Sequence, residues 1–317
     1  MIKLINVNSY QFVNTVNISM SRNHSPKISS GFYENDCFVK NKEQNFTGLK
    51  HVIKGLYKNL VIKLSPLKVH LTKYDTERVL AARIDQLNAQ HSLQEKFGVI
   101  STDLIQTEER KLLRLDVVKK LLKDATPVKS GIDPELYITM GLPGSGKSSV
   151  IEKPLLKKIK AVVLDKDDAK EFLPEYKNGK ANYVVCDEAD DIIHLAFNKA
   201  LESRFNLVMP NIGTVYEDVK QLAQTAKDKG YKVHLRFVEV DKDVAAQRAI
   251  NRFQKSGRFT ETLIHEYLGD KPKENYTQLF EHDKNLFETF AAYSNDVPKN
   301  DPPIFIKELS NIEKSEV

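Results

Sequence analysis

Residues 136–150 read Leu-Tyr-Ile-Thr-Met-Gly-Leu-Pro-Gly-Ser-Gly-Lys-Ser-Ser-Val. Within this stretch, the spacing Gly-x-x-x-x-Gly-Lys-Ser/Thr of a phosphate-binding loop is matched by Gly141, Gly146, Lys147 and Ser148. The apolar, β-branched run before Gly141 predicts a strand, and the residues after Ser148 can begin a helix. Because the motif requires a strand, a loop and a helix in this order, we predict a P-loop at these residues.

The residues of this loop have separate expected roles. Glycines at 141, 144 and 146 allow backbone angles that other residues avoid, so successive N–H groups can surround a phosphate. Lys147 supplies positive charge for the β- and γ-phosphates, and the Ser148 hydroxyl can hold a Mg²⁺ ion that bridges them. The predicted nucleotide-binding set is Gly141, Gly144, Ser145, Gly146, Lys147, Ser148 and Ser149.

The composition is that of a globular protein with a mild positive charge. Hydrophobic residues make up 41% and charged residues 29% of the 317 positions, a length that allows two domains. The net charge of +5 suits a protein that handles anionic small molecules and does not by itself indicate nucleic acid. The first residues lack a signal-peptide pattern and no apolar run has membrane length, so we expect a cytoplasmic protein without a membrane span.

The first 125 residues are expected to form a smaller, mostly helical domain. Up to residue 70, ten Lys and Arg stand against three acidic residues, which fits a solvated face or contact with an acidic partner or nucleic acid. Apolar periodicity predicts helices at 76–90 and 108–122, with core faces formed by Val79, Leu80, Ile84 and Leu87 and by Leu112, Leu115, Val118 and Leu122. Prolines and a glycine within 125–134 predict a linker, so we place the domains at 1–125 and 126–317.

A second strand is predicted at 160–164, and it ends in the acidic sequence Asp165-Lys-Asp-Asp. In an open α/β sheet, ligands bind outside the carboxyl ends of the strands, so these carboxylates should lie near the transferred phosphate. One carboxylate can accept the proton of an attacking hydroxyl, and another, with Asp165 as our candidate, can orient a hydrated Mg²⁺. The alternative is that Asp165 or Asp167 only caps a helix.

The remaining pattern completes an α/β fold of the P-loop NTPase or kinase type, a parallel sheet flanked by helices. We predict helices at 187–204 and 217–229 and strands at 206–209, 231–240 and 303–308. A basic helix carrying Arg248 and Arg252 follows, and then Lys255-Ser-Gly-Arg258. Arginines near a P-loop can neutralise charge on the γ-phosphate, although surface arginines are common.

Residues 136–308 resemble the zeta-toxin group of P-loop kinases. The resemblance depends on the loop Gly-Leu-Pro-Gly-Ser-Gly-Lys-Ser-Ser, on Leu-Asp-Lys-Asp-Asp, and on shorter pieces around Glu188, Arg252 and Arg258 in the same order. It implies that Asp167 is the general base on a sugar hydroxyl, and that Lys147, Arg252 and Arg258 bind the γ-phosphate. It also implies that Glu188, at the start of a helix, helps to hold the substrate.

One segment departs from the family pattern. The better-known members of the group have a Glu-Gly-Thr that touches the nucleotide sugar. This chain has Pro210-Asn-Ile-Gly-Thr214 instead, so Asn211 and Thr214 become the candidate substrate contacts. The loss of the carboxylate argues against an acceptor that depends on it, such as UDP-N-acetylglucosamine. An NAD-like dinucleotide, as proposed for some relatives, stays open as the acceptor.

The leading functional hypothesis is therefore an ATP- and Mg²⁺-dependent kinase that acts on a hydroxyl of a nucleotide-containing metabolite, as a toxin or effector. The alternatives are a polynucleotide or nucleoside kinase, supported only by the basic first segment, and an ATP-controlled binding protein without catalysis. Asp167 and the two arginines argue against the last, because a switch needs no base for an acceptor. The N-terminal helices are either an inhibitor in cis, as separate antitoxins are for the family, or a module for binding a partner or for delivery into a target cell.

Overall fold

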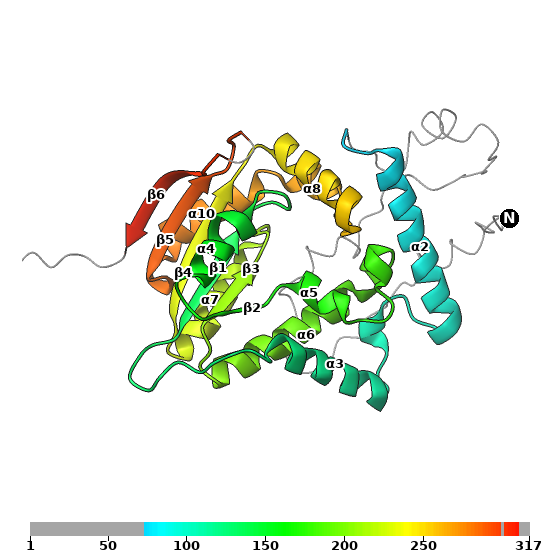
Figure 1. Cartoon of the computed structure of the whole chain (residues 1–317), viewed down its shortest axis with the longest axis horizontal. Helices are drawn as coiled ribbons and strands as arrows, with labels where there is room; N and C mark the ends of the chain where they lie inside the picture. Colours follow the sequence, from blue (N-terminus) through cyan, green and yellow to red (C-terminus); the bar gives the residue numbers. More distant parts are fainter. Residues whose placement is uncertain (1–72, 299–300, 311–317) are drawn as a thin grey trace, which may run out of the picture. The chain divides into compact units, whose positions relative to one another are not determined.

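The structure is a computed structural model of the chain, and it describes residues 73–298 and 301–310 (Figure 1). The predicted basic segment up to residue 70 lies outside these residues. A six-stranded sheet has the order β2-β3-β1-β4-β5-β6, and all neighbouring strands are parallel except β5 and β6. The strands are β1 Glu135–Met140, β2 Val162–Val163, β3 Leu207–Pro210, β4 Lys232–Glu239, β5 Thr289–Ser294 and β6 Ile304–Ser310. The predicted α/β class is confirmed.

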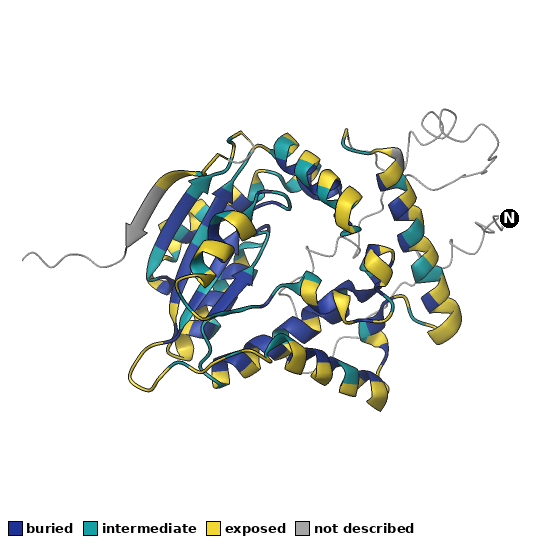
Figure 2. Cartoon of the chain, viewed as in Figure 1, coloured by how far each residue is buried: buried dark blue, intermediate teal, exposed yellow. Residues whose placement is uncertain are grey.

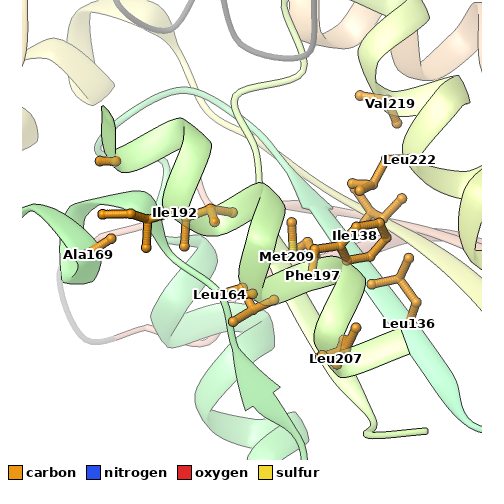
Figure 3. Packing of buried hydrophobic residues seen from close by; sticks show 14 of the residues in the cluster. Leu136, Ile138, Leu164, Ala169, Ile192, Phe197, Leu207, Met209, Val219 and Leu222 are labelled. Atoms are coloured by element: carbon orange, nitrogen blue, oxygen red, sulfur yellow. The ribbon is translucent and has the colours of Figure 1, made fainter. Parts of the chain in front are cut away.

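The first strand, β1, lies in the middle of the sheet between β3 and β4, and one of its two faces is entirely apolar. Leu136, Ile138 and Met140 are fully buried, and Ile138 lies in register between Met209 of β3 and Leu235 of β4. Side chains two positions apart in a strand point to the same face, so Leu136, Ile138 and Met140 form the face of β1 that packs in the main core. Figure 3 shows Leu136, Ile138, Leu207 and Met209 packed with Phe197 in the main core.

Helices of two sizes accompany the sheet. The longer ones are α2 Glu77–Phe97, α3 Glu108–Leu121, α6 Asn182–Glu202, α7 Tyr216–Asp228, α8 Lys242–Ser256 and α10 Lys271–His282. The shorter ones are α4 Lys153–Leu156, α5 Lys166–Glu171 and α9 Leu263–Leu268, with single turns η2 Thr102–Leu104, η3 Ser148–Glu152, η4 Lys177–Gly179 and η5 Lys284–Leu286. Helices α7 and α10 pack on β4, and α6 packs against α2, α3 and α5. None of these described helices is long and apolar enough to cross a membrane.

Both predicted N-terminal helices are present, but their predicted apolar faces are largely wrong. Ile84 and Leu87 of α2 are 47% and 37% exposed, and Leu112 and Leu115 of α3 are 65% and 50% exposed. The buried positions are instead Val79, Ala82, Arg83, Gln86 and Leu93 in α2, and Arg110, Arg114, Val117 and Val118 in α3 (Figure 2). The reason is that acidic and backbone partners on other elements neutralise the arginines, so polar side chains occupy the inner face.

Helices α2 and α3 share the main core with the sheet. Leu93, Val117 and Val118 belong to the same buried cluster as Leu136 of β1. Contacts also place the described residues in one compact unit. The division of the chain at residue 125 stays a prediction.

Candidate active site

A cleft of about 370 Å³ lies at the carboxyl ends of the central strands. Its walls come from the P-loop after β1, the turn between β2 and α5, the start of α6, the end of β3, α8 and the loop after α8. In open α/β proteins, ligands bind in the crevice outside the carboxyl ends of the parallel strands, which is where this cleft lies. The cleft brings together most of the predicted site residues, namely Gly144, Gly146, Lys147, Ser148, Asp165, Asp167, Asn211, Arg252 and Arg258.

The P-loop has the expected conformation, and a side chain at Gly144 or Gly146 would collide with a neighbouring residue. Gly144 and Gly146 have φ values of 89° and 94°, which favour glycine. A Cβ atom on Gly144 would lie 2.2 Å from the carbonyl oxygen of Ala245, and one on Gly146 would lie 2.3 Å from Nδ2 of Asn295. The loop is therefore packed directly on α8 and on Asn295, the residue that follows β5.

The polar residues of the loop point to several partners. Lys147 Nζ donates to the carbonyl oxygens of Gly141 and Leu142, so the ammonium lies folded over the loop. Ser149 Oγ donates to the carbonyl oxygen of Gly146 at 3.0 Å. The Ser145 side chain is fully buried, and its Oγ atom has no hydrogen-bond partner among the described residues.

Asp165 begins α5 as its N-cap. Its Oδ1 atom accepts from the backbone N–H of Asp167 at 2.9 Å, and its Oδ2 atom lies 3.1 Å from Nη2 of Arg258. Asp165 therefore caps a helix, but capping is not its only contact, because it also pairs with Arg258 in the cleft wall. One carboxylate oxygen caps the helix and the other pairs with an arginine. If Asp165 also orients hydrated Mg²⁺, the ion must therefore share this carboxylate with Arg258.

Asp167 lies in the first turn of α5 between two cations. Lys170 Nζ donates to its Oδ1 atom at 3.0 Å, and Arg258 forms an ion pair with its Oδ2 atom. Burial raises the pKa of Asp167, but Lys170 and Arg258 outweigh it and hold the pKa well below its ordinary value. Asp167 is therefore ionised near neutral pH, which is the form that accepts a proton.

The arginines of the cleft differ in their partners. Arg248 Nη1 donates to the backbone of Asn295 at 3.1 Å. Arg252 Nη2 donates to Thr260 Oγ1 at 3.2 Å, and its pKa is lowered by burial and by neighbouring Arg258. The Nε atoms of Arg252 and Arg258 are buried without a hydrogen-bond acceptor in the described part of the chain. Donors with no acceptor, next to a P-loop lysine, fit the phosphate oxygens of a bound nucleotide.

Sequence comparison decides the family to which the chain belongs. Residues 118–286 match the family model of the zeta toxin, which is more than half of the chain. This chain belongs to the zeta toxin family. A search among curated proteins found no match.

One solved structure that is similar to this zeta toxin family member shares its fold, and a second is more distant. A structure from the PezAT chromosomal toxin-antitoxin system of Streptococcus pneumoniae superposes with a TM-score of 0.52 at 18% identity, over 64% of this chain and 82% of the other. A structure of AvrRxo1-ORF1:-ORF2 with ATP has a TM-score of 0.49 at 12% identity, over 64% of this chain and 68% of the other. Only the first of these two likenesses is close enough to indicate the fold.

Glu188, expected to hold the substrate, lies elsewhere in this zeta toxin family member. Helix α6 begins at Asn182, five residues before the predicted start, so Glu188 belongs to its second turn. Its side chain is 0% exposed, is not part of the cleft wall, and pairs with Arg110 and with Arg114 Nε at 2.8 Å. The expectation is corrected, because the arginines of α3 occupy both carboxylate oxygens.

The segment after β3 places only one of its two predicted residues at the cleft. Asn211 is part of the wall, and its side-chain oxygen accepts from the N–H of Gly213 at 2.6 Å. Thr214 is buried and is not part of the wall. Asn211 therefore shapes the turn with its side chain, as Asn often does in loops.

Sequence reasoning missed several residues of the wall. Glu152 is buried one helical turn after Ser148, accepts from Thr139 Oγ1 at 3.2 Å, and has a pKa that burial raises. Its spacing of four residues from Ser148 was a usable signal. Asn182, Tyr183 and Glu261 also line the cleft, but nothing local in the sequence distinguishes them.

Proposed function

We propose that this member of the zeta toxin family is an ATP- and Mg²⁺-dependent kinase that phosphorylates a hydroxyl group of a nucleotide-containing metabolite. The observation that carries the proposal is the contact of Asp167 with Arg258 in the cleft that also holds Lys147 of the P-loop. Asp167, the proposed base for the acceptor hydroxyl, thus lies next to Arg258, one of the cations proposed for the γ-phosphate. That arrangement is what phosphoryl transfer requires, because positioning and charge stabilisation account for most of its catalysis.

Asp167 is the proposed general base. Its ionised carboxylate accepts the proton of the attacking hydroxyl. A very low pKa makes a weak base, and Arg258 is one of the causes of that low pKa. We expect a bound triphosphate to share the guanidinium of Arg258, which would raise the pKa of Asp167 towards the working pH.

The other cations serve the transferred phosphate. Lys147, Arg252 and Arg258 stabilise the charge that spreads over its oxygens. Bound Mg²⁺ would supply further charge neutralisation between the β- and γ-phosphates. Ser148, with Asp165 or the buried Glu152, would hold the ion through one or two protein oxygens, as is usual for Mg²⁺.

The acceptor is best described as a nucleotide-like molecule with a free hydroxyl. Asn182, Tyr183 and Thr260 offer neutral hydrogen-bonding groups in the cleft, and Lys166 and Lys170 add positive charge near Asp167. Both features fit a polar, anionic acceptor such as UDP-N-acetylglucosamine or an NAD-like dinucleotide. The absence of a carboxylate in the turn at 211–214 favours the dinucleotide.

We further propose a toxin or effector role in the cytoplasm of the producing cell or of a target cell. Membership of the zeta toxin family supports this role. A partner antitoxin is suggested by the toxin-antitoxin system of Streptococcus pneumoniae, whose structure shares this fold. An inhibitor in cis, formed by the N-terminal helices within residues 1–125, is the other form of the same idea.

The experiment that tests the proposal measures phosphate transfer from labelled ATP with Mg²⁺. The acceptors are UDP-N-acetylglucosamine, NAD, nucleosides and a DNA oligonucleotide. Asp167→Asn is compared with Glu171→Gln, which removes the same charge from an exposed position of the same helix. We expect one small acceptor to be labelled, a loss of about 10²–10⁴-fold with Asp167→Asn, and no change with Glu171→Gln.

Two results would overturn the proposal. Labelling of the oligonucleotide alone would indicate a polynucleotide kinase. Tight ATP binding without transfer to any acceptor would indicate a nucleotide-controlled binding protein.

A further inference from the structure

Helix α2 lies before residue 118, where the family match begins, yet it contacts both walls of one end of the cleft. This is the end of the cleft at which Asp167, the proposed general base, lies. Lys170 Nζ donates to Asp167 Oδ1 and to Asn182 Oδ1, at 3.0 Å each, and Tyr183 is the next residue along the wall. We refer to residues 177–183 as the first wall and to residues 256–262, which include Arg258, as the second wall.

Gln86 of α2 holds the first wall. Its side chain is 0% exposed, its Nε2 atom donates to the carbonyl oxygen of Gly179 at 2.7 Å, and its Oε1 atom accepts from the N–H of Tyr183 at 3.0 Å. The one side-chain amide therefore satisfies the carbonyl group of Gly179, before the start of α6, and the N–H group of Tyr183, just after it. Buried groups of this kind are costly to leave without partners.

Arg83, one turn earlier on the same helix, holds the second wall. Its Nε atom donates to Glu261 Oε2 at 3.2 Å, and its Nη2 atom donates to Thr262 Oγ1 at 2.9 Å. Its Nη1 atom pairs with Asp75 at 3.0 Å. Burial raises the pKa of Glu261, but the charge of Arg83 outweighs it and keeps this buried carboxyl ionised.

The two walls also touch each other. Tyr183 Oη donates to Glu261 Oε2, so the wall residue held by Gln86 bonds the wall residue held by Arg83. A Cβ atom on Gly179 would lie 2.1 Å from the carbonyl oxygen of Gly257, which precedes Arg258. The turns are in close backbone contact, and a change in one wall must move the other.

We propose that α2 is a clamp of the acceptor site, in which Arg83 and Gln86 are positioning residues that fix the separation of the two walls. The clamp keeps Tyr183 in the wall and Arg258 beside Asp167. No described residue of α2 is part of the cleft wall, so the helix acts from behind the site. The link to an acceptor depends on the proposed function, whereas the mechanical role of α2 does not.

The test compares two clamp variants with matched controls in the full chain. Arg83→Met and Gln86→Leu remove the side-chain bonds. Lys96→Met and Gln94→Leu are the controls, which remove a positive charge and an amide at exposed positions of α2. Arg83→Lys keeps the positive charge but loses the forked geometry of the guanidinium. If Arg83→Met fails to fold, Gln86→Leu still tests the clamp, because it leaves no buried charge unpaired. Hydrogen exchange of the backbone amides and nucleotide kinetics are the measurements.

We expect amide exchange in 177–183 and 256–262 to rise about tenfold in the clamp variants and to stay unchanged in the controls. Exchange of the P-loop amides at 141–148 should not change. The KM for the acceptor that wild type phosphorylates should rise about tenfold, with a smaller change in kcat. The KM of Arg83→Lys should lie between those of wild type and Arg83→Met.

Unchanged exchange in both walls would overturn the clamp. Increased exchange with an unchanged acceptor KM would overturn its link to the acceptor. If wild type labels no acceptor, the proposed function fails, but exchange in the two walls still decides whether α2 clamps them.

Discussion

Nε of Arg114 lies 2.8 Å from the carboxylate of Glu188, and both side chains are buried between α3 and α6. Arg110 shares the same carboxylate and also pairs with Glu175 at 2.9 Å. A buried charge network of this kind ties residues before the family match to its core. Its main consequence is for stability, because an uncompensated buried charge is expensive.

Glu188→Ala is expected to lower the free energy of unfolding by about 3–5 kcal/mol, since buried Arg114 loses its carboxylate partner and Arg110 keeps only Glu175. Urea denaturation measures this loss. Glu108→Ala is the control, because its ion pair with Lys111 is exposed and should change stability by less than about 1 kcal/mol. A stable Glu188→Ala protein with a raised KM for the acceptor would contradict this role and restore the substrate-binding role implied by family resemblance.

Gly144→Ala is expected to abolish ATP binding or to prevent folding. The added Cβ atom would lie 2.2 Å from the Ala245 carbonyl oxygen, so the P-loop or α8 must move. Gly131→Ala is the matched control, because Gly131 also has positive φ but no atom lies within 4 Å of the position that its Cβ would take. It should cost about 1 kcal/mol without changing the Kd for ATP. Wild-type ATP affinity in Gly144→Ala, measured by calorimetry, would refute the prediction.

His234 is expected to make the protein less stable as the pH falls from 6.5 to 4. Burial, with help from Arg236 and Lys232, lowers the pKa of His234 to about 4. The ring stacks on Tyr137 at 4.4 Å and contacts Thr289 Oγ1 at 2.8 Å. Above pH 6.5 the imidazole is neutral in both states. Between 6.5 and 4 only the unfolded chain binds the proton, so folding stability falls by up to about 3 kcal/mol.

His234→Phe should remove this part of the pH dependence while keeping a stacked ring. His282→Phe, at an exposed position, should follow wild type. The free energy of unfolding is measured by urea titration at each pH. Parallel curves for wild type and His234→Phe between pH 6.5 and 4 would show that the neutral ring does not contribute.

Glu152→Gln is expected to weaken the Mg²⁺ dependence of ATP binding. The carboxylate lies in the cleft wall one turn after Ser148, where it can hold the ion or one of its waters. The midpoint of a Mg²⁺ titration, followed with a fluorescent ATP analogue, should rise about tenfold, a magnitude typical of losing a group that supports a metal site. Glu171→Gln should leave the midpoint unchanged, and an unchanged midpoint in Glu152→Gln would exclude this role.

The parts that the sequence predicted correctly depend on neighbouring residues. The strand before Gly141, the P-loop and the basic helix with Arg252 each follow from spacing within about 15 residues. Strand β5, with α9 and α10 before it, was not predicted. Helix α6 was given a late start because Asp187 and Glu188 suit the positive end of a helix dipole, although the helix begins at Asn182.

The sequence by itself determined the chemistry of the P-loop, because a phosphate is bound by backbone N–H groups whose geometry depends on adjacent glycines. Only the tertiary structure decided which charged residues serve the site and which serve the core. Arg83 and Glu261 are 178 positions apart, and Arg114 and Glu188 are 74 apart. Whether a charge lines a cleft or is neutralised in the interior depends on the partner that folding brings opposite it, and no local pattern contains that partner.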